Sequence, residues 1–181
     1  MAILGVNDFK AKLKGGGARP NLFQVLLSFP AYVQADNNLA SFMIKGAGLP
    51  ASTMGVIPVN YRGRTLHVAG DRTFEPWSIE VINDTDFSLR TSMEQWMNGM
   101  NAHVQNTGVT DPNDYQTNAT VQQLDKDGSV LYSYNFKSIF PINVGEVGLS
   151  WDNVDAIETF PVTFAIQYWE SVTGTGQQVT S

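Results

Sequence analysis

The side chains that could carry out catalysis or hold a metal ion are sparse in this sequence. It contains no cysteine, which excludes thiolate nucleophiles, cysteine-ligated zinc sites and disulfides. Its two histidines, His67 and His103, lie far apart in the sequence and form no local cluster. The composition still allows one kind of metal site, a site built from carboxylates alone that binds a hard divalent cation.

Two pairs of carboxylates and one glycine-rich segment look like sites but have structural explanations. The carboxylate pairs are Asp84 with Asp86 and Asp125 with Asp127. One pair falls at a predicted helix start and the other at a predicted turn, where aspartates accept hydrogen bonds from backbone amides. Gly46–Ala51 formally fits the dinucleotide-binding pattern, but Pro50 and Pro58 prevent the helix that this motif needs. We therefore predict that the chain is not an enzyme and binds no cofactor or metal.

Short apolar segments separated by turn-forming residues predict a mainly β chain. Apolar and polar residues alternate in Trp77–Val81, Val130–Ile139 and Glu158–Glu170, which is the period of a strand with one buried face. Asp125–Gly128 has the composition of a hairpin turn. The other strand candidates are Asn21–Phe29, Phe42–Lys45, Arg64–Ala69, Ala119–Leu124 and Val147–Trp151. Because the strands come as hairpins, we expect an antiparallel β-sandwich or barrel.

One helix is predicted beside these strands. Met93, Trp96, Met97 and Met100 follow the spacing i, i+3, i+4, i+7, which makes one apolar stripe on a helix. Asn83–Thr85 supplies capping residues before it. The expected fold is therefore mainly β, an antiparallel β-sandwich or barrel with one flanking α-helix. Two segments are predicted to be loops, Ala31–Leu39 and Asn101–Asn118. A third, Gly46–Pro58, is predicted to be a loop or the edge strand of a sheet.

The length of 181 residues suggests a single domain with an arm at one end and a tail at the other. Residues 1–20 contain a triple glycine and are predicted to form an N-terminal arm. Residues 21–170 form the β domain, and the Gly/Thr/Gln-rich residues 171–181 form a C-terminal tail. No apolar run approaches the roughly 18 residues needed to cross a bilayer, so no membrane anchor is expected.

Charge is divided unevenly along the chain, whose net charge is −6. Residues 1–72 hold eight Lys or Arg and three acids, a net of +5, whereas residues 73–181 hold three bases and fourteen acids, a net of −11. The overall acidic balance argues against a general nucleic-acid binder. The division indicates either two differently solvated faces or head-to-tail association of copies, which builds rings and filaments.

Several ordered blocks of residues resemble one family. They include Arg19–Val25, Leu49–Ala51, Ile57–Val59, Val68–Phe74 with Trp77, Asn143–Glu146, Trp151-Asp152 and Tyr168–Glu170. In this order they resemble the tail tube proteins of contractile-tailed, T-even-like bacteriophages, from about Arg19 to Glu170. The arm through Gly17 departs from that pattern, as do the longer Pro30–Leu39 and Asn101–Asn118 loops and the tail.

The resemblance implies a structural role and a set of partners. It implies that six copies form a ring, that rings stack into the inner tube of the tail, and that the tube conducts DNA into the host. The implied partners are further copies of the chain, the sheath, baseplate, tail-terminator and tape-measure proteins, and transiting DNA bound without sequence specificity. The implied location is the virion tail, after assembly in the host cytoplasm.

Three sets of residues are candidates for these contacts. We predict that basic and acidic residues meet between copies, with the interface candidates Arg19, Arg62, Arg64, Asp71, Arg72 and Glu75. A channel that passes DNA needs few cations, because phosphate contacts drive non-specific binding. The candidates for a channel-facing position are Ser133, Asn135, Thr159, Thr163 and Gln167, and the candidates for the sheath-facing side of the helix are Arg90 and Glu94.

Alternative explanations stay open from the sequence. The interface arginines could pair within one copy, for instance Arg72 with Asp71 or Glu75, and the channel candidates could be ordinary solvent-facing strand residues. The chain could also be a baseplate tube-initiator paralogue, or the tube protein of a related contractile injection system. A monomeric carbohydrate-binding β-sandwich, using exposed aromatics such as Trp151 or Trp169, is an alternative of another class.

Overall fold

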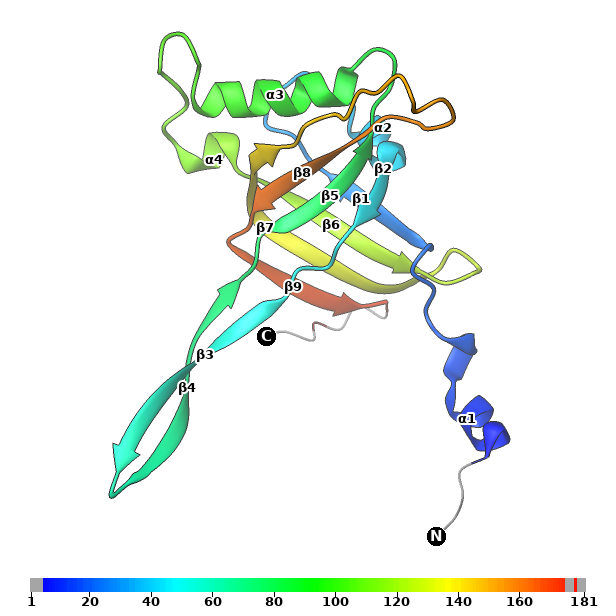
Figure 1. Ribbon diagram of the computed structural model, residues 1–181, viewed down its shortest axis with the longest axis vertical. Coiled ribbons are helices and arrows are strands. Elements are labelled where there is room, and N and C mark those ends of the chain that lie inside the picture. The colour runs from blue at the N-terminus through cyan, green and yellow to red at the C-terminus, as the bar shows by residue number, and fades with distance from the viewer. Residues whose placement is uncertain (1–4, 175–177, 179–181) are drawn as a thin grey trace.

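Two antiparallel sheets that share one long strand form the body of the molecule (Figure 1). The computed structural model describes residues 5–174 and 178. One sheet contains β1 (Phe23–Leu27), β6 (Thr117–Leu124), the first part of β7 (Val130–Val144) and β9 (Tyr168–Thr173). The other contains β2 (Ile44–Ala47), β5 (Trp77–Ile82), β8 (Thr159–Ala165) and the last part of β7. The expected mainly β, antiparallel sandwich is confirmed.

The long strand β7 changes sheets in its middle. Residues 132–137 pair with β9, whereas residues 140–144 pair with β8. Between these stretches Ser138 has a φ of 53°, in the left-handed region, which turns the strand. The amide of Asn118 on β6 lies at this corner, where its side-chain oxygen accepts a hydrogen bond from the Ser138 amide at 3.2 Å. One strand therefore ties the two sheets into a single unit.

The core lies between the two sheets and under the longest helix, α3 (Ser88–Met100). Trp77 of β5 stacks on Phe136 of β7, with ring centroids 4.6 Å apart, and tilts against Phe164 at 5.4 Å. Trp96 of α3 reaches the same cluster, 5.9 Å from Phe164, and its Nε1 donates to the carbonyl of Tyr115 at 2.8 Å. All of these rings are fully buried except Tyr115. The predicted helix stripe therefore packs in the core, with Met93 and Trp96 at its centre.

The start of α3 depends on Asp84, as the capping residues before it predicted. One Asp84 carboxylate oxygen accepts from the Ser88 amide at 3.0 Å and the other from the Ser88 hydroxyl at 2.7 Å. We expect Asp84→Ala to lower the free energy of unfolding by about 1 kcal/mol, since it leaves a helix amide without an acceptor. Asp84→Asn keeps an acceptor and is expected to lose less. Urea unfolding of both variants checks this, and equal losses would show that the hydrogen bond is not the cause.

The β3–β4 hairpin projects from the body as a separate two-stranded sheet (Figure 1). β3 (Ser52–Tyr61) and β4 (Arg64–Phe74) are joined at Arg62-Gly63, both with positive φ, 46° and 76°. That geometry is the two-residue turn that best matches strand twist. Nearly every residue of the two strands is exposed. The predicted strand Arg64–Ala69 is confirmed as part of β4. Gly46–Pro58, predicted to be a loop or an edge, contains the end of β2 and, from Ser52, much of β3.

Several other local predictions differ from the structure. Ala31–Leu39 is not all loop and Phe42–Lys45 is not all strand, because α2 (Asn37–Met43) runs through both, with Asp36 accepting from the amides of Asn38 and Leu39 at its start. Asn101–Asn118 contains one short helix, α4 (Pro112–Tyr115). Val147–Trp151 is not a strand.

The segment Glu158–Glu170 is not one strand. It forms β8 and β9 with a break at Ile166-Gln167, and the two strands belong to different sheets. The Asp125–Gly128 turn is confirmed. In it Asp127 accepts from the Ser129 hydroxyl at 2.6 Å, and hydrogen bonds from Ser129 lower the pKa of the Asp127 carboxyl.

Candidate subunit interfaces

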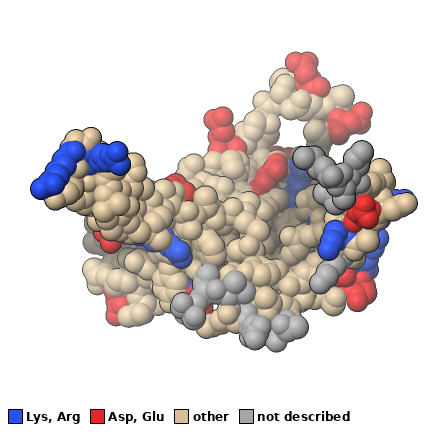
Figure 2. Space-filling view, turned by 90° about the horizontal axis from the view of Figure 1, so that it is seen from below, with Lys and Arg blue, Asp and Glu red and all other residues tan. Residues whose placement is uncertain are grey.

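Five of the six interface candidates come together on or beside the projecting hairpin. Arg62 lies in its turn, Arg64, Asp71 and Arg72 lie on β4, and Glu75 follows directly after β4. Arg19 is separate: it lies before β1, where its carbonyl accepts from the Gln123 side chain at 2.7 Å. The hairpin thus carries a basic turn region at one end of the molecule, and Figure 2 shows blue atoms gathered there.

The charged side chains of the hairpin make no ion pair with one another in the part of the chain that the structure describes. The two ion pairs found in that part join Lys45 to Glu80 and Arg90 to Glu94. Arg62 lies over the ring of its neighbour Tyr61 at 5.3 Å and is exposed to solvent. Pairing of Arg72 with Asp71 or Glu75 within one copy, the alternative explanation, is therefore not observed.

The hairpin also exposes a large apolar surface. Large side chains that face solvent on it are Met54, Val56, Ile57, Val59, Tyr61, Leu66 and Val68. A two-stranded hairpin is marginally stable in water without further packing. Its two strands pair only with each other, so each presents backbone groups along its outer edge. An element of this kind needs a partner surface.

The channel candidates divide between the outer faces of the two sheets. Ser133 and Asn135 lie on β7, beside Gln122 and Thr120 of β6, and the Thr120 hydroxyl donates to the Asn135 side chain at 3.0 Å. The inner face of the same strands carries the buried Ala119, Val121 and Phe136. The alternation predicted for β7 is therefore confirmed in its first part.

Thr159 and Thr163 lie on the outer face of the other sheet. Thr163 is within hydrogen-bond distance of the Ser78 hydroxyl at 3.2 Å, and Thr159 donates to Glu80 at 2.9 Å. Gln167 is exposed at the corner between β8 and β9, where its amide donates to the carbonyl of Lys137 at 3.2 Å. Since the outer faces of a sandwich point away from each other, the five candidates do not share one surface.

The sheath-facing candidates form an i, i+4 pair on α3. The Arg90 Nε lies 2.9 Å from Glu94 Oε1, and the Arg90 Nη1 donates to the carbonyl of Gly145 at 3.2 Å. Arg90 also lies 5.3 Å from the ring centre of Phe160. Its side chain is only 22% exposed, whereas that of Glu94 is 58% exposed. Arg90 thus holds α3 to the loop after β7, and Glu94 is the one of the two that faces solvent.

No group of three or more metal-ligating side chains occurs among the residues that the structure describes. His67 is exposed on the hairpin and His103 is exposed after α3, so neither lies in an enclosed site.

A comparison with protein families matches residues 18–172 to the model of the phage tail tube protein. The chain belongs to this family. As a tail tube family member it is a structural, non-enzymatic component of the virion tail of a contractile-tailed phage. No helix among the described residues of this tail tube protein has the length and apolar character to cross a membrane.

Known relatives cover nearly the whole tail tube protein. It is 37% identical over 167 residues to the tail tube protein gp19 of Enterobacteria phage T4, an alignment that covers 91% of this chain and 99% of the relative. It is 26% identical to the tail tube protein of Serratia phage KSP90, covering 92% and 96%. The fold is similar to a chain in the sheath-tube complex of an extracellular contractile injection system, PVC, with a TM-score of 0.64, 12% identity and coverage of 93% and 98%. The family match decides against the carbohydrate-binding alternative.

Sequence reasoning missed two exposed apolar surfaces of this tail tube protein. One is the hairpin described above, of which only the charges were singled out. The other is the loop between β7 and β8, where Leu149, Trp151, Val154 and Ile157 all face solvent. Leu149 and Trp151 keep the two-residue spacing of a strand, and Val147–Trp151 was predicted to be a strand. After Asp152, Val154 and Ile157 no longer follow that spacing.

Proposed function

We propose that six copies of this chain close into a ring, and that rings stack into the inner tube of the tail, through which DNA passes into the host. The observation that carries the proposal is the projecting hairpin, a largely exposed element with apolar side chains and open strand edges. Such an element is stabilised when further copies cover it. Native mass spectrometry and negative-stain imaging of the purified chain test the proposal. Six-membered rings or tubes support it, and a monomer at high concentration contradicts it.

The channel wall is best supplied by the outer face of β1, β6, β7 and β9. The register places Gln24 opposite Gln122, and Gln122 opposite Ser133. In the next polar row Thr120 lies opposite Asn135, and Asn135 lies opposite Glu170. Leu26 of β1 extends the second row and Val172 of β9 extends the first. Neither row carries a cation, and Lys137 lies one row further on the same side of β7, so the face offers passing DNA few phosphate contacts. Neighbouring copies would extend the sheet into a closed barrel at its end strands, β1 and β9. Within one copy Val172 of β9 already pairs with Gln178.

The contacts between rings are assigned to the hairpin. Arg62, Arg64 and Arg72 have no acidic partner in one copy within the described part, while the chain after residue 72 has a net charge of −11. Exposed ion pairs are each worth only about 0–1 kcal/mol, but repetition around a ring sets the register of one copy on the next. We assign Asp71, Glu75 and Arg19 to the same set of contacts between copies.

The outer side of the tube is assigned to the other tail proteins. Similar folds occur in a sheath-tube complex, in a tube-terminating cap and in a baseplate of contractile injection systems, each with a TM-score of 0.64. By analogy we assign the solvent-facing side of α3, with Glu94 and the adjoining Arg90, to the sheath. Contacts with baseplate, terminator and tape-measure proteins belong to the same proposal.

Lysines on the channel wall are expected to hold DNA. In assembled particles that carry Ser133→Lys with Asn135→Lys, we expect fewer adsorbed particles to deliver DNA. Raising the salt concentration should relieve the defect, because each phosphate contact adds a slope of roughly 0.9 to the dependence of log affinity on log salt. The measurement is the fraction of adsorbed particles that release their DNA, at two salt concentrations.

Two lysine variants on other surfaces serve as controls. Thr163→Lys places the same charge on the outer face of the second sheet, and Gln95→Lys places it on the exposed side of α3. If only the Ser133 and Asn135 variant fails, the first sheet lines the channel. If Thr163→Lys fails instead, the second sheet does. Normal delivery by all three variants would remove both surfaces from the channel.

A further inference from the structure

The N-terminal arm carries an amphipathic helix whose apolar side is uncovered. In α1 (Val6–Lys12) and its C-cap, Val6, Phe9 and Leu13 follow the spacing i, i+3, i+7 and lie on one side. None of them is buried, and Phe9 is 65% exposed. Lys10 and Lys12 flank this stripe and are exposed as well. A helix of seven residues is too short to be stable alone in water, so packing must hold it.

The family model does not extend to this arm. The family model begins at residue 18, after α1 and the three glycines that follow it. Gly15, Gly16 and Gly17 all have positive φ, at 62°, 77° and 83°, a backbone that only glycine adopts freely. The arm therefore leaves the body at a defined bend, with its apolar stripe free for a contact made elsewhere.

A surface of complementary character lies in the loop between β7 and β8. Leu149, Trp151, Val154 and Ile157 are exposed there, and Trp151 is fully exposed. The acids of this loop are Glu146, Asp152, Asp155 and Glu158, and no Lys or Arg follows Lys137 in the chain. Residues 146–158, which we name the acidic loop, thus combine apolar side chains with negative charge, where α1 combines apolar side chains with lysines.

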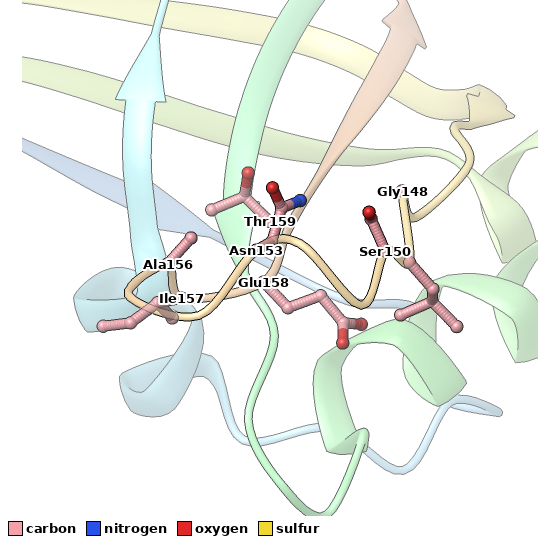
Figure 3. Close-up of a pocket in the computed structure, with 8 residues that line it drawn as sticks. Gly148, Ser150, Asn153, Ala156, Ile157, Glu158 and Thr159 are labelled. Atoms are coloured by element: carbon pink, nitrogen blue, oxygen red, sulfur yellow. The ribbon is translucent and has the colours of Figure 1, made fainter.

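The acidic loop is also hollowed. It curls around a cavity of about 360 Å³ that is lined by Gly148, Leu149, Ser150, Asn153, Ala156, Ile157, Glu158 and Thr159. Figure 3 shows these residues arranged along the loop, with the Glu158 carboxylate among them. Gly148 has open space around it, so a ring such as that of Phe9 can approach the backbone there. Aromatic anchors that fill such hollows carry much of the energy of protein interfaces.

The two surfaces cannot meet within one copy, because they lie at opposite ends of the molecule. In Figure 1 the arm and the projecting hairpin lie at the lower end, and the loop before β8 lies at the upper end beside α3. A contact between unlike surfaces on opposite ends repeats from copy to copy in one direction.

We propose that α1 of one copy docks on the acidic loop of a second copy, so that the arm ties successive rings together. The inference rests on the proposed assembly of rings into a tube and names one contact between the rings. The apolar stripe covers Trp151 and its neighbours, and Lys10 and Lys12 meet Asp152 and Asp155.

Disulfide trapping tests the contact directly, because the chain has no cysteine of its own. One set of subunits carries Phe9→Cys and another carries Val154→Cys, and the two are assembled together and oxidised. We expect a dimer on a non-reducing gel that neither set gives alone. Val104→Cys, equally exposed but outside the acidic loop, is the matched control and should give no dimer with Phe9→Cys. Dimers of equal yield with Val104→Cys, or none with Val154→Cys, would overturn the proposal.

Charge exchange gives a second readout. Lys10→Glu with Lys12→Glu should raise the subunit concentration needed for tube formation about tenfold, and Asp152→Lys with Asp155→Lys should do the same. Combining all four changes should restore tube formation, since the charges then attract again. All of these side chains are exposed, so the variants should fold.

The outcomes separate this proposal from the function on which it rests. Rings that form but do not stack in the arm variants support the arm contact. Tubes that form normally in all arm variants overturn it and leave the tube function intact. Arm variants that stack normally but lose binding to anionic lipid vesicles would assign the basic amphipathic helix to a membrane surface, which also overturns it. A wild-type chain that forms neither rings nor tubes contradicts the proposed function itself.

Discussion

Replacing Trp77 by alanine is expected to lower the free energy of unfolding by about 3–5 kcal/mol, the range for large-to-small changes in a packed core. Trp77 is fully buried between the two sheets and contacts the rings of Phe136 and Phe164. Since small domains are stable by only about 5–15 kcal/mol, the variant should lie close to unfolding at 37 °C. Urea unfolding below the concentration of assembly measures the change.

Two tryptophan variants make the result interpretable. Trp77→Phe keeps most of the volume and removes an indole Nε1 that is buried without a hydrogen-bond partner in the described structure, so it should cost far less than alanine. Trp151→Ala removes the same side chain from a fully exposed position and should change the free energy of unfolding by less than about 0.5 kcal/mol. Equal midpoints for Trp77→Ala and Trp151→Ala would show that the stack does not stabilise the fold.

The sequence predicted best those elements that have one buried side. In β5 the residues Trp77, Ile79 and Val81 are buried, and Ser78 and Glu80 between them face outward. The apolar period of two in the sequence results from that one-sided burial. The apolar stripe of α3 was predicted from the sequence for the same reason. Where the fold buries one side of an element, hydrophobic patterning predicts the element.

The elements that were missed, β3 and α2, bury little within one copy. Every residue of β3 is exposed, and Pro58 lies in it opposite His67. Proline within a strand pattern argues against a central strand, and here it lies in an isolated ladder with open edges. In α2 only Ala40 is buried, so no stripe marks the helix. Hydrophobic patterning gives no signal where an element buries neither side within one copy.

The channel candidates show what alternation cannot supply. It assigned Ser133 and Thr163 correctly to the outward side of their strands, but it does not say which sheet a strand joins. The alternation of Glu158–Glu170 runs on through Ile166-Gln167, where the chain passes from one sheet to the other. Because β7 also changes sheets at Ser138, the local sequence does not predict whether a residue lies on the outer face of the first sheet or of the second.

Reversing the charges of the hairpin is expected to abolish stacking while rings still form. The variant carries Arg62→Glu, Arg64→Glu and Arg72→Glu. Each attraction, worth up to about 1 kcal/mol when exposed, becomes a repulsion of similar size, and the change repeats in every copy around a ring. The side chains are exposed and unpaired within one described copy, so folding should be unaffected. Negative-stain imaging counts rings and tubes.

A neutral variant separates charge from packing in this hairpin. Arg62→Gln, Arg64→Gln and Arg72→Gln together keep long polar side chains without charge, and they should weaken stacking less than the glutamates do. Wild-type stacking should weaken as salt rises from 0.05 to 0.5 M, because exposed ion pairs are screened, whereas the glutamate variant should recover with salt as its repulsion is screened. If neither the charge changes nor the salt concentration alters stacking, the contact between rings is made by the exposed apolar side chains of the hairpin, such as Val56 and Ile57.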